Sequence, residues 1–78
     1  MVRQARTILA DAIAPHRAAQ PSIVTIPKDA VEIAFMLGGY GDEATKKWIN
    51  SFIRAGIIKI TRKDDVIYYT VDPFLLIQ

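Results

Sequence analysis

Cysteine is absent from this 78-residue sequence, and histidine occurs once, as His16. Without thiols the chain can form neither a disulfide framework nor a thiolate metal site, and one imidazole cannot build a zinc site alone. Catalysis would require a nucleophile with a companion base, or a pair of carboxylates, and the acidic residues are scattered over different predicted elements. The sequence therefore predicts no metal, no cofactor and no enzymatic activity.

Long apolar runs are also missing. A membrane-spanning helix requires about 20 consecutive apolar residues, and no segment approaches that length. The N-terminal residues 1–6 are not followed by the long apolar region of a secretory signal. Together with the lack of cysteine, this pattern predicts a cytoplasmic protein without membrane contact, and no small-molecule ligand is evident.

The overall charge decides little, because Lys and Arg (10) only slightly outnumber Asp and Glu (8), for a net charge of +2. Hydrophobic residues make up 51% of the chain, which is enough for one compact core. We therefore expect a single domain spanning residues 1–78. A core of this size is marginal for a lone monomer, so help from a partner is expected.

Apolar periodicity, prolines and glycines divide the chain into short elements. Pro15 interrupts a first amphipathic helix, Pro27 stands at the start of a second, and Gly56 is a natural left-handed stop for a third, which Asp42 is expected to cap. The predicted helices cover residues 4–14, 28–37 and 42–55, and the predicted strands cover residues 22–26, 57–61 and 66–71. Asp72 and Pro73 predict a further helix start, so residues 72–78 begin a C-terminal helix or form a docking tail.

Each predicted helix has an apolar stripe that is expected to face the core. The stripes are Ile8, Leu9, Ala12 and Ile13 in the first helix, Val31, Ala34, Phe35 and Leu37 in the second, and Thr45, Trp48, Ile49, Phe52 and Ile53 in the third. Trp48 and Phe52 could in principle stack on single-stranded bases, but their place in this stripe assigns them to the core.

This order of elements, with the glycine turn Gly38–Gly41 before the third helix, resembles the winged helix-turn-helix domain. The match spans about Thr7 to Val71: Ser22–Ile26 as first strand, Pro27–Leu37 as second helix, Asp42–Ala55 as recognition-like helix and Ile57–Val71 as wing. The resemblance implies an α+β fold of three helices, a short strand and a C-terminal two-stranded β-hairpin wing. It also implies that the third helix enters the major groove of double-stranded DNA while the wing approaches the backbone or an adjacent minor groove.

The polar face of the predicted third helix carries side chains suited to DNA, namely Lys46, Lys47, Asn50 and Arg54, with Glu43 on the same ridge. Asn pairs bidentately with adenine, Arg pairs with guanine, and lysines neutralise phosphates. A purely solvated face is the alternative for this pattern when it stands alone.

The hairpin and the glycine turn supply the other candidates. Arg62 and Lys63 are expected to contact the DNA backbone, whereas Asp64 and Asp65 oppose insertion of the tip and suit its turn geometry. The Tyr40 hydroxyl either reaches a phosphate or covers the helix junction.

The sequence thus predicts a sequence-preferring double-stranded DNA-binding protein, acting as a small transcriptional regulator. A homodimer is the second hypothesis, through the apolar tail Phe74–Ile77 and the alanine-rich first helix. The alternative function is a winged-helix protein-interaction module that docks a larger complex. Salt-dependent affinity for duplex DNA discriminates the two, because counterion release requires several phosphate contacts.

Overall fold

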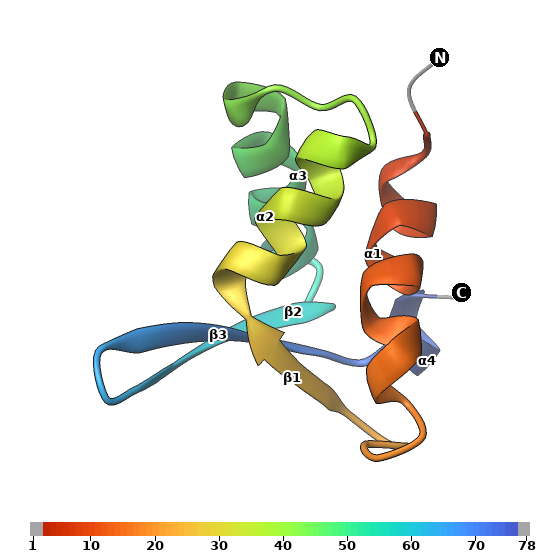
Figure 1. Cartoon of the computed structure of the whole chain (residues 1–78), viewed down its shortest axis with the longest axis vertical. Coiled ribbons are helices and arrows are strands. Elements are labelled where there is room, and N and C mark those ends of the chain that lie inside the picture. The colour runs from red at the N-terminus through yellow and green to blue at the C-terminus, as the bar shows by residue number, and fades with distance from the viewer. Residues whose placement is uncertain (1–2, 77–78) are drawn as a thin grey trace.

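Three helices lie together on one side of a small antiparallel sheet in the computed structural model, which describes residues 3–76 (Figure 1). The helices are α1 (Ala5–Ile13), α2 (Lys28–Leu37), α3 (Asp42–Arg54) and the short α4 (Pro73–Leu76), and the strands are β1 (Val24–Pro27), β2 (Ile58–Lys63) and β3 (Val66–Val71). The fold is therefore α+β, with four helices where three were predicted.

Proline and glycine set the helix boundaries. Pro15 ends α1, and the chain continues as a 3₁₀ turn over Ala14–His16. Gly56 follows α3 with a φ of 79°, the left-handed conformation that the sequence predicted for this stop. Gly39, with a φ of 98°, similarly reverses the chain between α2 and α3.

Strand β3 lies at the centre of the sheet, in the order β1-β3-β2. Tyr69 of β3 is opposite Ile26 of β1 and Ile60 of β2. Because side chains alternate along a strand, one sheet face carries the buried residues, and the other carries the threonines of all three strands. On that outer face Thr70 Oγ1 lies 3.2 Å from Thr25 Oγ1 and 3.4 Å from Thr61 Oγ1.

A two-residue turn joins β2 to β3. Both of its residues, Asp64 and Asp65, have positive φ, 51° and 66°. This is the left-handed geometry that matches the twist of a hairpin, and it confirms that the two acidic residues suit the turn. The turn is shorter than the predicted cluster because Arg62 and Lys63 still pair with Ile67 and Val66.

The core lies between the helices and the inner face of the sheet. Its largest fully buried side chains are Phe35, Leu9, Ile13, Ile26 and Ile58. Most of the predicted stripes point into it, with two exceptions. Leu37 is 85% exposed and Trp48 is 43% exposed, so the assignment of both residues to the core was wrong. Each lies at the edge of its stripe, where the core ends.

The predicted cap of α3 was also wrong. Gly41, not Asp42, is the N-cap residue, and no side chain hydrogen-bonds there. Asp42 instead occupies the first helical turn, where its charge complements the helix dipole. Strand β1 begins at Val24, two residues later than predicted.

The predicted C-terminal helix start is confirmed. The Asp72 carboxylate accepts a hydrogen bond from the Phe74 amide at 3.0 Å, and α4 follows. Arg6 of α1 donates to the Leu76 carbonyl at 2.7 Å, so α4 docks on the chain's own first helix. Ile77, the last residue of the predicted tail, lies outside the described residues. Within residues 3–76, no helix has the length and apolar character needed to cross a membrane.

Candidate nucleic-acid interface

The two faces of α3 differ sharply in chemistry. Thr45, Ile49 and Phe52 are buried against the core. The opposite face is exposed and carries Glu43, Lys47, Asn50 and Arg54. The helical period of 3.6 residues explains this separation, because residues three and four apart share a face. The predicted polar ridge is therefore present on the surface.

The cations on this ridge are not neutralised by neighbouring carboxylates. Lys46, Lys47 and Arg54 make no ion pair within residues 3–76. Asp42 and Glu43 stand in the first turn of the same helix, but neither reaches a lysine within salt-bridge distance. The ridge thus presents two donor types to a partner: flexible ammonium groups near the middle and a guanidinium near the C-terminal end.

A groove separates α3 from the hairpin. It is lined by Lys28, Glu32, Lys46, Ile49, Asn50, Ile53, Ile60 and Tyr69. Lys46 therefore lies on the flank of α3 that faces the sheet, beside Asn50. Lys28, the first residue of α2, joins them, although the sequence marked it only as a helix start.

One acidic residue enters the same groove. Glu32 of α2 lies near Tyr69, and burial together with this carboxylate raises the pKa of the Tyr69 hydroxyl above its ordinary value. The groove therefore carries charges of both signs, negative from Glu32 and positive from Lys28 and Lys46.

The hairpin divides its two candidate cations between opposite faces. Arg62 is opposite Ile67 in the sheet. Along their strands, Arg62 lies four residues from the buried Ile58 and Ile67 lies two residues from the buried Tyr69, so all four side chains are on one face. Arg62 is thus on the sheet face that α3 covers. Lys63 falls on the outer face, as does Lys59, because strand side chains alternate. The structure brings Arg62 to the side of α3, and it does not bring Lys63 there.

Tyr40 is used to join helices. Its hydroxyl donates a hydrogen bond to the Arg3 carbonyl oxygen at 2.7 Å. Its ring packs edge-on against Phe35, with centroids 5.3 Å apart. These contacts tie the start of α1 to the turn before α3, which is the junction-covering role that the sequence allowed.

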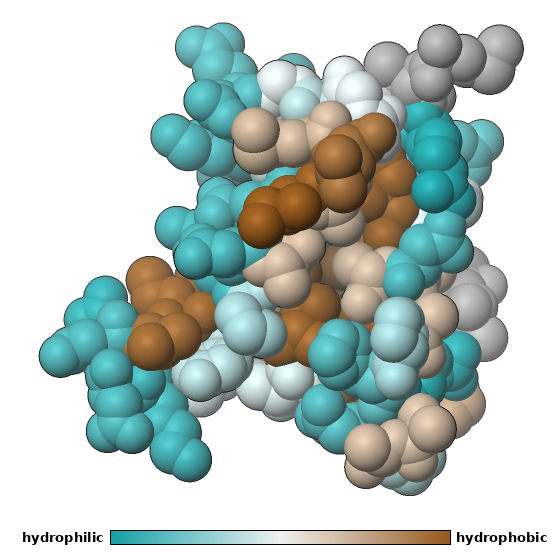
Figure 2. Space-filling model, in the orientation of Figure 1, coloured by the Kyte–Doolittle hydropathy of each residue, from teal (hydrophilic) through white to brown (hydrophobic). Residues whose placement is uncertain are grey.

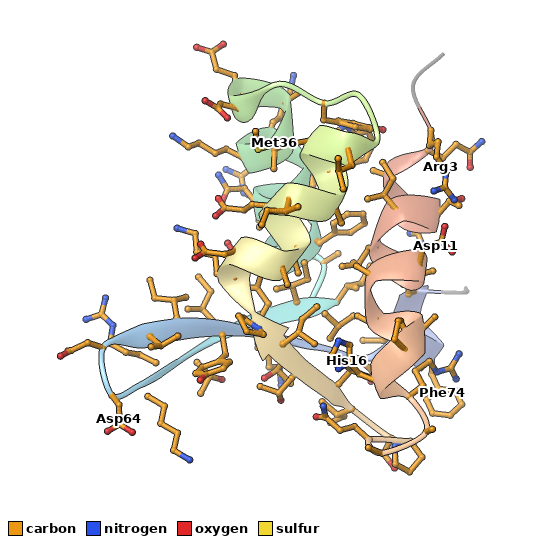
Figure 3. All side chains as sticks on the ribbon, in the orientation of Figure 1. Arg3, Asp11, His16, Met36, Asp64 and Phe74 are labelled. Carbon is orange, nitrogen blue, oxygen red and sulfur yellow. The ribbon has the colours of Figure 1, made fainter. Side chains whose placement is uncertain are left out.

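Trp48 occupies the opposite flank of α3 from Lys46. It lies 6.0 Å from the Phe52 ring, centroid to centroid, and lines a shallow pocket with Tyr40 and with residues 3–6. The sequence did not predict this pocket, because it depends on where the start of α1 lies. Figure 3 shows the other end of the candidate surface, with Asp64 at the tip of the hairpin and away from the helices.

Comparisons of the chain with protein-family models, with curated proteins and with solved structures return no match. Within residues 3–76 there is also no group of three or more His, Asp and Glu side chains that could hold a metal ion. The assignment of function therefore depends on the surface of α3 and its neighbours.

Proposed function

We propose that this protein is a winged helix-turn-helix domain that binds double-stranded DNA with sequence preference, as a small transcriptional regulator. The observation that carries the proposal is the exposed ridge of α3. Its three cations, Lys46, Lys47 and Arg54, lack intramolecular ion-pair partners in the described chain, and Asn50 lies among them. Such a face suits a polyanion with readable base edges.

The arrangement around α3 supports this proposal. A short helix, α2, precedes it across a glycine turn, and a hairpin follows it, with β1 completing the sheet beside β3. In helix-turn-helix domains the second helix lies in the major groove while the first helix crosses the backbone, and α2 and α3 would take these two positions.

Each residue then has a defined task. Asn50 and Arg54 read bases, adenine and guanine respectively, through bidentate hydrogen bonds. Lys46 and Lys47 neutralise phosphates, and Lys28 joins them from the start of α2. Arg62 reaches the backbone from the hairpin. Asp64 and Asp65 keep the tip itself out of the groove, because carboxylates repel phosphates.

The test is a titration of the protein with duplex DNA at several salt concentrations, followed by fluorescence anisotropy of labelled DNA. We expect the logarithm of the binding constant to fall linearly with the logarithm of salt concentration, by about 0.9 per phosphate neutralised. Lys47→Ala should weaken binding equally on all sequences and reduce this slope by about 1. Asn50→Ala should instead remove about 1–3 kcal/mol of discrimination at one base pair.

A matched control is Lys59→Ala, which removes the same charge from the outer face of the sheet. It should change the slope much less than Lys47→Ala does. Equal loss on all sequences after Asn50→Ala would rule out its base-reading role. If duplex DNA does not bind even at low salt, the proposal fails, and the protein-interaction module becomes the better description, with the apolar outward face of α2 as its distinguishing observation.

A further inference from the structure

Helix α2 is apolar on two opposite faces. Val31 and Phe35 are fully buried in the core. The solvent side carries exposed apolar residues at helical spacing, Ala30, Ile33 and Leu37, and the half-buried Ala34 lies at the edge next to α1. Ile33 and its neighbour Met36 are each 55% exposed, in addition to the nearly bare Leu37. The solvent face of a surface helix is ordinarily polar, and here Asp29 is the exposed acidic residue beside Ile33. The large apolar side chains on this face therefore lack a covering partner within the described chain.

The stripe continues onto α1. Figure 2 shows apolar side chains gathered over α2 and the adjoining face of α1. Between the two helices lies a groove lined by Ile8, Ala12, Ala34, Leu37 and Gly38, together with Arg3 and Asp11. Gly38 allows α1 to pack closely against α2 here, because the Ile8 side chain occupies the space where a Cβ would stand. We call the surface formed by Ala30, Ile33, Ala34, Leu37 and this groove the α1/α2 face.

The charges on the α1/α2 face occur as a pair of opposite sign. Arg3 and Asp11 form an ion pair along α1, and both side chains are more than half exposed. Among residues 3–76, no other charged side chain lines the groove. A partner that is apolar in the middle and carries one anion and one cation at its edge would complement this face, because its charges could exchange with this ion pair.

A second copy of the chain meets these requirements, and we propose that the α1/α2 face forms an isologous homodimer with α2 antiparallel to the partner's α2. A two-fold axis across α2 reverses the direction of the Arg3 and Asp11 pair. Arg3 then faces the partner's Asp11, and Asp11 faces the partner's Arg3. In the centre, Ala30 and Ala34 leave room for the larger Ile33 and Leu37 of the partner subunit.

This dimer leaves the polar ridge of α3 free. Lys47, Asn50 and Arg54 take no part in the α1/α2 face. The hairpin projects sideways from the helices, away from α1 (Figure 1). A two-fold axis that runs parallel to the direction in which the hairpin projects keeps both hairpins on the same side of the dimer. The inference does not rest on DNA binding, and the two can fail separately.

The proposal moves the dimer surface away from the C-terminal tail that the sequence favoured. Phe74 and Leu75 are exposed, and Leu75 lines a small pocket with Ile23. However, α4 already docks on α1 through Arg6. Phe74 therefore provides a matched control for an exposed apolar residue outside the α1/α2 face.

The first experiment is sedimentation velocity over a range from micromolar to sub-millimolar protein, without DNA. We expect the wild type to dimerise, Leu37→Glu to raise the dimer dissociation constant by ~10-fold or more, and Phe74→Glu to leave it unchanged. Circular dichroism should show all three folded, because both side chains are exposed. A wild type that stays monomeric throughout overturns the proposal. So does a dimer that survives Leu37→Glu or is lost in Phe74→Glu.

The second experiment tests the charge pairing across the two-fold axis. Arg3→Asp leaves two carboxylates on the edge, and Asp11→Arg leaves two guanidinium groups, so each variant alone should dimerise more weakly than the wild type. An equimolar mixture should form the heterodimer in preference to either homodimer, because opposite charges then meet across the interface. Native mass spectrometry distinguishes the three species by mass. A statistical mixture would show that these charges do not face each other and would overturn the antiparallel arrangement.

Discussion

The outward faces of α2 and α3 are adjacent on the molecule and opposite in chemistry. Inside, both helices bury apolar side chains against one core, Phe35 from α2 and Ile49 and Phe52 from α3. Outside, α2 shows Ile33 and Leu37, whereas α3 shows a ridge of lysine, asparagine and arginine. The inner faces are apolar because they pack in the core, whereas the outer faces are available for contact with other molecules. The two proposals follow this difference, with an apolar partner proposed for α2 and a polyanion proposed for α3.

The largest expected effect comes from comparing the two faces of α2 itself. Phe35→Ala should lower the free energy of unfolding by about 3–5 kcal/mol, because it leaves a cavity in a fully buried site. Leu37→Ala should stay within about 0.5 kcal/mol at concentrations where the chain is monomeric, since its side chain is exposed. Urea denaturation at low protein concentration measures both. Comparable losses would mean that the outer stripe is part of the monomer's own core.

A smaller effect is expected where α2 ends against α1. Gly38 has a φ of −80°, so its backbone would accept any residue, but an added Cβ would collide with the buried Ile8 side chain. Gly38→Ala should therefore cost about 1–3 kcal/mol through overpacking. Gly41→Ala is the reference without a steric clash, because a Cβ added there would meet no atom within 4 Å; any loss in it reflects only the poorer capping of α3 by alanine. If the two variants unfold at the same denaturant concentration, the close approach of α1 and α2 does not limit stability.

Local signals in the sequence were sufficient to predict where most helices and strands of the fold begin and end. Pro27 immediately precedes α2, Gly56 follows α3, and the hairpin turn falls where two aspartates adopt left-handed conformations. These features act within a few residues, so a single sequence contains them. The edges of the apolar stripes were predicted less well, because burial there depends on which neighbouring element covers the helix. Leu37 and Trp48 were misassigned for this reason.

The candidate site was predicted in part, for the same physical reason. The ridge of α3 follows from helical periodicity alone, so Lys47, Asn50 and Arg54 could be named in advance. The groove partners Lys28 and Glu32 depend on how α2 packs beside α3, which no local pattern states. The division of Arg62 and Lys63 between two faces follows from strand alternation once the register against β3 is known.

The smallest expected effect concerns the inner face of α3, which buries the hydroxyl group of a threonine, whereas the buried residues of α2 are Val31 and Phe35. Thr45 is buried, and its Oγ1 has no hydrogen-bond partner within residues 3–76. Thr45→Val keeps the shape and removes the hydroxyl, so it should raise the free energy of unfolding by about 1 kcal/mol. Thr45→Ala, which also removes a methyl group, should not share this gain, because the lost packing opposes it. Urea denaturation of the three proteins provides the comparison, provided that the dependence of the unfolding free energy on urea concentration is the same for all three. A valine variant less stable than the wild type would show that the hydroxyl is hydrogen-bonded in solution and that the inner face of α3 requires it.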